Sequence, residues 1–215
     1  MRYMKLLGLE IMVLAIGATV VFGQGNQEAA NLTREGIEAS KAKDWDKAIA
    51  AFKRATQLDQ HYAPNLASAL QQRAGVYVGQ GKFQEAVTDY SEALKVKAQD
   101  PDIFERRAYA EMQLKNYDRA LHDYSEAIKL SPEEPKYYQV RALIYQTKGD
   151  FKAALADVDK ILKLDPNNQD ALQRKKFLEA KLYAPPTPPP TPAGPIPNPN
   201  VRPPATATAT PTAKR

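Results

Sequence analysis

Six charged residues recur along the chain at a fixed spacing. Three evenly spaced arginines are each followed, after the same interval, by an aspartate: Arg73 with Asp89, Arg107 with Asp123, and Arg141 with Asp157. A row of arginines could hold an anionic ligand, because guanidinium groups bind carboxylates and phosphates through paired hydrogen bonds. Alternatively, the arginines and aspartates could form a ladder of ion pairs between neighbouring helices. A periodic acid for every periodic base favours the ladder.

Other residues that could support catalysis are few. The absence of cysteine excludes a disulfide scaffold, a zinc ribbon and a thiol nucleophile. Of the two histidines, His61 has no evident partner, and His122 is better interpreted as an exposed surface residue than as a base paired with Asp123. The sequence contains no glycine-rich phosphate loop and no HExxH, GxSxG or calcium-loop pattern. We therefore expect no enzymatic activity, no cofactor and no metal site.

The periodic charges lie within a repeated helical pattern. In four segments an aromatic residue precedes an alanine by three positions: Trp45 and Ala48, Phe83 and Ala86, Tyr117 and Ala120, and Phe151 and Ala154. The last three alanines are evenly spaced, and the interval between the first two is slightly longer. They recur with a period of about 34 residues, which is typical of stacked helix-turn-helix units. Small and aromatic residues alternate at helical spacing, so a ring on one helix can lie over an alanine of the next.

Residues 29–168 resemble the tetratricopeptide repeat family. The first helices carry its large and small apolar positions as Leu32 and Gly36, Leu70 and Ala74, Phe104 and Ala108, and Tyr138 and Ala142. The family's tyrosine one turn further is present as Tyr77 and Tyr145 and is replaced by Ala39 and Glu111. The second helices carry Phe52, Tyr90, Tyr124 and Val158 at one large position. The periodic arginines stand where the family more often has leucine.

The resemblance implies an all-α fold, a right-handed α-solenoid of helix-turn-helix repeats. We expect a short lead over 24–28, repeats over 29–62, 67–100, 101–134 and 135–168, and a capping helix over 169–183. The first spacing contains four additional residues around Pro64, and proline suits the first turn of a helix. These residues predict an opening helix about one turn longer in the second repeat.

The N-terminus has the pattern of a secretory signal peptide over 1–23. Arg2 and Lys5 precede an apolar run over 11–22, and small or apolar residues lead up to Gln24. An uncleaved membrane anchor is the alternative, but Glu10 interrupts the apolar stretch, and the uninterrupted run is too short to span a bilayer. We expect an extracytoplasmic protein, either in a bacterial periplasm or secreted and at the cell surface.

The C-terminal segment 184–215 is rich in proline and threonine. Twelve of the chain's 17 prolines lie between Pro185 and Pro211, and the segment has no aromatic residue. It cannot bury enough apolar surface to fold, so we expect a disordered or polyproline-like tail.

The net charge of +5 does not indicate a nucleic-acid-binding protein. Residues 1–23 contribute +1 and residues 184–215 contribute +3, whereas residues 24–183 contain 25 basic and 24 acidic residues. The repeats are therefore nearly neutral, and binding to nucleic acid is not expected. We also expect no membrane contact after signal removal, unless the leader is kept as an anchor.

In the family that the sequence resembles, the first helices line a concave surface. The resemblance places ten residues there: Arg34, Ile37, Gln72, Gly75, Val78, Arg106, Tyr109, Met112, Leu143 and Gln146. Such a mixed apolar and polar groove suits an extended peptide or a partner helix, although several of these side chains could instead pack between repeats. The family's chaperone-tail binders use a clamp of lysine and asparagine. Here Thr33, Gln71 and Glu105 stand at the lysine-bearing turn, so chaperone C-termini are not the expected partner.

The sequence thus predicts an exported, non-catalytic scaffold or adaptor that binds another polypeptide through this groove. The alternative is a structural protein of the cell envelope. In that case the tail over 184–215 would act as a spacer or wall-associating segment, and the repeats would anchor it.

Overall fold

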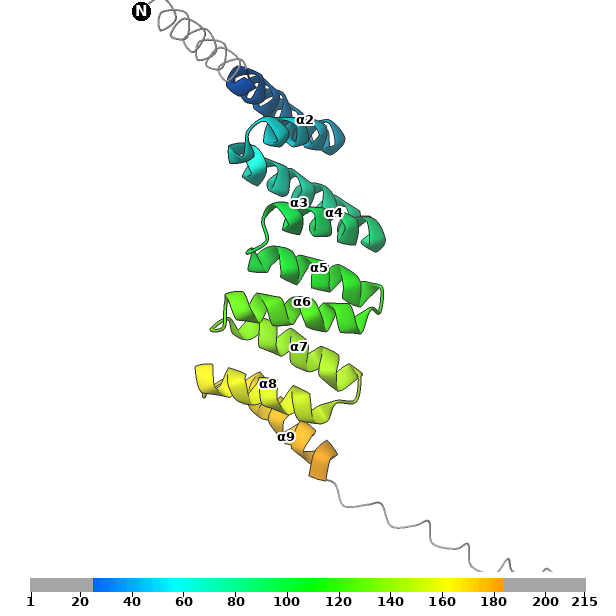
Figure 1. Cartoon of the computed structure of the whole chain (residues 1–215). Coiled ribbons are helices and arrows are strands. Elements are labelled where there is room, and N and C mark those ends of the chain that lie inside the picture. The colour runs from blue at the N-terminus through cyan, green and yellow to red at the C-terminus, as the bar shows by residue number, and fades with distance from the viewer. Residues whose placement is uncertain (1–24, 184–215) are drawn as a thin grey trace, which may run out of the picture. The chain divides into compact units, whose positions relative to one another are not determined.

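The computed structural model describes residues 25–183, and these fold into helices joined by short turns (Figure 1). Residues 25–41 form the first helical segment. The later elements are α2 (Trp45–Leu58), the short 3₁₀ helix η1 (Gln60–Tyr62), α3 (Ala63–Gly79), α4 (Phe83–Val96), α5 (Pro101–Gln113), α6 (Tyr117–Leu130), α7 (Pro135–Thr147), α8 (Phe151–Leu164) and α9 (Gln169–Tyr183). No strand occurs within 25–183. The predicted signal peptide and the predicted tail lie outside the described residues.

Consecutive helices pack against one another in chain order. The helices pair as α3 with α4, α5 with α6 and α7 with α8, and each pair also contacts the next through α4 with α5 and α6 with α7 (Figure 1). This arrangement confirms the expected all-α solenoid of repeated helix pairs. The first helix of the second repeat, α3, has 17 residues, whereas α5 and α7 have 13 each. The residues inserted around Pro64 therefore lengthen this helix by about one turn.

Local sequence explains where the helices end. The turn inside each pair contains a residue in the left-handed region: Lys43, Gly81, Lys115 and Gly149, with φ of 58°, 73°, 62° and 80°. This conformation reverses the chain within a few residues and lets later amides bond back to the helix, as Lys82 N–H does to the Tyr77 carbonyl at 2.8 Å. Proline begins α5 and α7, where a missing N–H costs nothing.

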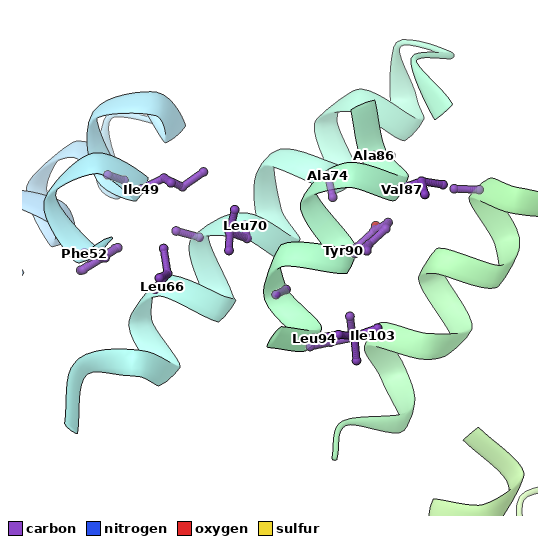
Figure 2. Packing of buried hydrophobic residues seen from close by; sticks show 14 of the residues in the cluster. Ile49, Phe52, Leu66, Leu70, Ala74, Ala86, Val87, Tyr90, Leu94 and Ile103 are labelled. Atoms are coloured by element: carbon purple, nitrogen blue, oxygen red, sulfur yellow. The ribbon is translucent and has the colours of Figure 1, made fainter. Parts of the chain in front are cut away.

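The core consists of small residues opposed by large ones. Ala48, Ala86, Ala120 and Ala154 are completely buried. Phe52, Tyr90, Tyr124 and Val158, one turn further along the same helices, are no more than 3% exposed. Figure 2 shows this packing in the first half of the array, where Leu94 of α4 lies beside Ile103 of α5. Alanines allow close approach of the backbones, and the large side chains fill the space between successive helices.

The last helix, α9, covers the end of the array with one face. Ala171 and Leu178 are buried, whereas Phe177 is 44% exposed. Lys176 stands at the position in α9 that corresponds to Ala142 in α7. Ala142 is buried where the first helix of a repeat packs against its second helix, whereas Lys176 is exposed. Phe177 lies on the outer side of the helix, where Lys181 Nζ stands 5.7 Å from the centre of its ring. The helix therefore caps the array.

Substituting two glycines by alanine should have opposite effects on stability. A Cβ added to Gly36 would lie 2.6 Å from the buried Phe52 ring, whereas one added to Gly75 meets nothing within 4 Å. Overpacking at Gly36→Ala should lower the free energy of unfolding by about 1–3 kcal/mol, offset only in part by the better helix propensity of alanine. Gly75→Ala should raise it by about 0.5–1 kcal/mol. Urea denaturation of both variants tests this, and stabilisation by Gly36→Ala would contradict the packing described.

Candidate functional site

A cavity of about 700 Å³ opens across the first helices α3, α5 and α7. Its lining also includes one tyrosine from each of the second helices α4 and α6. The residues that line it are Gly75, Val78, Tyr90, Glu105, Arg106, Tyr109, Met112, Tyr124 and Val140. We refer to this cavity and its lining as the groove. Tyr109 is 46% exposed, so its ring presents apolar surface at the groove.

The groove brings together some, but not all, of the predicted binding residues. Val78, Arg106, Tyr109 and Met112 line it together, with Gly75 beside them. The other predicted residues are outside its lining. Arg34, Ile37 and Gln72 are exposed on the first helical segment and α3, and Leu143 is 42% exposed on α7. Gln146 is half-buried, and its Oε1 accepts a hydrogen bond from Arg174 Nη1 at 3.3 Å.

Sequence reasoning missed the contribution of the second helices. Tyr90 and Tyr124 stand at the large position of the second helices, and both are buried, with exposures of 2% and 3%. Both residues nevertheless contribute to the lining of the groove, from the second helices α4 and α6. The sequence did contain a signal for this contribution, namely a tyrosine at a core position that a phenylalanine could fill. A buried tyrosine hydroxyl needs polar surroundings.

The polar side chains in the lining of the groove are three tyrosines, Glu105 and Arg106. Burial raises the pKa of Tyr90, and burial together with the nearby Glu105 raises the pKa of Tyr124, so both hydroxyls remain protonated at neutral pH. Glu105 Oε2 lies 2.9 Å from Lys136 Nζ, and this contact raises the pKa of Lys136. Apolar walls with a few polar groups suit an apolar side chain whose flanking peptide groups need hydrogen bonds.

The periodic arginines bind the periodic aspartates in all three repeats that carry them. Each arginine donates from Nε and Nη2 to both carboxylate oxygens of its aspartate at 2.7–2.9 Å. The aspartate side chains are 3–6% exposed, and the arginines 18–22%. The ladder prediction is therefore confirmed. The paired guanidinium groups are committed to the fold and do not form a free anion-binding row.

The ladder also links successive repeats, which the sequence reasoning did not predict. Arg107 Nη1 donates to Ser91 Oγ at 3.0 Å, and Arg141 Nη1 donates to Ser125 Oγ at 2.9 Å. Each serine lies on the second helix of the preceding repeat. The same spacing recurs at the end of the array, where Lys175 Nζ lies 2.7 Å from Asp159 Oδ1. Each of these basic residues thus joins one helix pair to the next.

Both histidines lie within the described residues 25–183. His122 is exposed, and its Nδ1 lies 3.4 Å from Oδ1 of Asp123, a carboxylate that already accepts two hydrogen bonds from Arg107. His61 lies in η1, with its ring edge-to-face against Tyr62. Among residues 25–183 no group of three or more histidine, aspartate or glutamate side chains is arranged to hold a metal ion. Within the same range no helix is long and apolar enough to cross a membrane.

Comparisons with known proteins agree with this architecture. Three family models, each described as a tetratricopeptide repeat, match residues 18–99, 72–135 and 135–168. A search of the curated proteins gives no match.

Solved structures of similar fold include the following two. A tetratricopeptide repeat protein from Parabacteroides merdae ATCC 43184 aligns with 26% identity and a TM-score of 0.56 over 73% of this chain and 60% of that chain. The MamA protein aligns with 18% identity and a TM-score of 0.54 over 73% of this chain and 83% of its own.

Proposed function

Because the chain belongs to the tetratricopeptide repeat family, we propose that it is a non-catalytic scaffold that binds a segment of another polypeptide in the groove. The observation that carries this proposal is the groove itself, with a volume of about 700 Å³ and an exposed Tyr109 on its wall. Proteins of this family are generally scaffolds, and no group of three or more histidine, aspartate or glutamate side chains within residues 25–183 is arranged to hold a metal ion. Binding without chemistry is the activity that such a surface supports best.

The lining of the groove favours an apolar anchor within an otherwise polar segment. Val78, Met112 and Val140 provide apolar contact, and the tyrosine hydroxyls can bond to the peptide groups of the bound segment. Ile37 and Leu143, on the first helical segment and α7, are 39% and 42% exposed and extend the apolar surface of the first helices beyond the groove. An extended segment longer than one anchor residue could therefore contact several repeats.

Charge at the groove argues against an acidic peptide terminus. Glu105 belongs to the lining, and Arg106 beside it is the one basic residue there. Lys136, which is outside the lining, is already paired with Glu105 at 2.9 Å. A segment with several carboxylates would face this glutamate without a set of free lysines to balance it. The preferred partner segment is neutral or carries a single acidic residue within reach of Arg106.

Export remains part of the proposal and rests on residues 1–23. Their basic start, apolar run and small residues before Gln24 are the pattern of a cleaved signal. N-terminal sequencing of the protein recovered from the cell envelope or the medium should find a chain beginning at Gln24 or close by, such as Asn26. Recovery of the intact leader in a membrane fraction would instead support a retained anchor.

Deleting residues 184–215 separates the scaffold proposal from the alternative in which the tail is the working part. The groove lies wholly within residues 75–140, so the shortened protein should bind its partner with unchanged affinity. Crosslinking in intact cells with a lysine-reactive reagent, followed by mass spectrometry, measures this. Loss of the crosslinked partner, or a defect in localisation with binding intact in the purified protein, would favour the tail as spacer or wall-associating segment.

A further inference from the structure

A second cavity, of about 490 Å³, lies against the second helices α4 and α6 and reaches α5. Val87 and Ser91 of α4, Arg107 and Glu111 of α5, and Arg119 and His122 of α6 are in its lining. We refer to it as the second-helix cavity. It shares no lining residue with the groove, so occupation of one does not require the other.

In the two other repeats that carry the ladder, a tyrosine ring lies beside the arginine. The guanidinium of Arg73 lies 5.8 Å from the centre of the Tyr77 ring, and that of Arg141 lies 6.0 Å from the centre of the Tyr145 ring. In each case the tyrosine lies one helical turn after its arginine. The residue at the same place after Arg107 is Glu111, which is shorter and has no ring. The cavity adjoins the arginine of the one ladder repeat that lacks the tyrosine.

Glu111, in the lining of this cavity, can accept further hydrogen bonds. Its side chain is only 4% exposed. Oε2 accepts a hydrogen bond from Asn116 Nδ2 at 2.7 Å, whereas Oε1 lies 3.6 Å from Arg119 Nη1, beyond hydrogen-bond distance. A buried carboxylate can accept several hydrogen bonds and is stabilised by each donor. A ligand in the cavity is therefore bound most tightly if it carries a hydrogen-bond donor that reaches the Glu111 carboxylate.

We propose that the second-helix cavity binds a tyrosine side chain of a partner polypeptide. The ring would lie against the Arg107 guanidinium and Val87, in the manner of Tyr77 under Arg73, and the hydroxyl would donate to Glu111. A tyrosine is neutral, so it leaves the pair of Arg107 and Asp123 intact. A carboxylate in the same place would meet the negative charges of Glu111 and Asp123, which disfavours an acidic side chain.

The test uses 4-methylphenol, the analogue of the tyrosine side chain, and N-acetyltyrosinamide, which adds the peptide groups. Titration of the full mature chain, followed by two-dimensional NMR, should perturb the amides of Glu111, Arg119 and His122. Dissociation constants on the order of 1 mM are expected for ligands of this size. Toluene, which lacks the hydroxyl, should bind about tenfold more weakly, because the donor to Glu111 is missing.

Two substitutions of Glu111 sharpen the result. Glu111→Tyr restores the ring of the neighbouring repeats, so it should fold normally and bind 4-methylphenol at least about tenfold more weakly. Glu111→Gln keeps the shape of the side chain but removes its charge, and should weaken the phenol several-fold while leaving toluene unchanged. Tyr109→Ala, in the groove, should leave all these affinities unaltered.

Other outcomes overturn the proposal. Equal binding by wild type and Glu111→Tyr would show that the ring does not enter this cavity, and perturbations confined to the groove would do the same. Binding of 4-methylphenol without N-acetyltyrosinamide would show that the cavity cannot accept a residue within a polypeptide. Failure of the groove substitutions to affect partner binding would count against the proposed function only, so the two proposals fail separately.

Discussion

Replacing Arg107 with leucine should lower the free energy of unfolding by about 3–5 kcal/mol. Arg107 donates two hydrogen bonds to Asp123, and the aspartate side chain is only 3% exposed. Leucine would leave this carboxylate buried without its counter-charge, and would also remove the hydrogen bond to Ser91 on the preceding repeat. Stability of this array depends on contacts between neighbouring repeats, so the loss should affect cooperative unfolding of the whole chain. Urea denaturation followed by circular dichroism measures it.

Arg106 provides a matched control, because it is the same residue type one position earlier. It is exposed and lines the groove, and Arg106→Leu should change the free energy of unfolding by no more than about 0.5 kcal/mol. The double variant Arg107→Leu with Asp123→Leu should regain most of the lost stability, since it removes the unpaired charge and not only one partner. An Arg107→Leu variant that unfolds like wild type but loses a ligand would instead revive the interpretation of the arginines as an anion-binding row.

The double substitution Tyr109→Ala with Leu143→Ser should abolish detectable partner binding, with a loss of affinity of at least about 30-fold. The helical content should be unchanged. Both side chains are more than 40% exposed on first helices, so truncating them leaves the buried core as it was. Tyr109 lies in the groove itself, where an exposed aromatic side chain is the type of residue that carries most of the energy of an interface. Crosslinked partner recovered from cells measures binding, and circular dichroism measures helicity.

The matched control is Phe177→Ala with Leu58→Ser. These residues have 44% and 46% exposure, similar to the groove pair, but neither lines the groove. The control should therefore retain the partner. If it loses the partner to the same extent as the groove variant, or if the groove variant still binds, the binding surface lies elsewhere on the protein.

Much of the fold follows from periodicity. The spacing of Ala86, Ala120 and Ala154 predicts helix pairs because a small residue at that point is needed wherever two helices approach closely. The ladder could be predicted for a similar reason, since each arginine and its aspartate keep one separation in every repeat. The serines bonded to Arg107 and Arg141 also repeat, but serine is common on exposed helix faces, so their spacing alone did not indicate a bond.

The groove could be predicted only in part. Periodicity identifies which residues share a face of the first helices, and this was enough to find Val78, Tyr109 and Met112. It does not show how deeply a side chain on the second helix reaches between two first helices, which decided the contribution of Tyr124. The cavity beside Glu111 also depends on the size of the side chains that the neighbouring helices place around it. The residue pattern of one helix contains no information about those side chains.

Site-specific photocrosslinking in living cells tests the central claim most directly. A photoreactive phenylalanine derivative at position 109 keeps an aromatic ring in the groove, and the same residue at position 177 serves as the control on α9. We predict that position 109 attaches one partner polypeptide through a single short segment, and that position 177 does not attach it. No adduct from position 109, or the same adduct in equal amount from position 177, would contradict the proposal that the groove binds the partner.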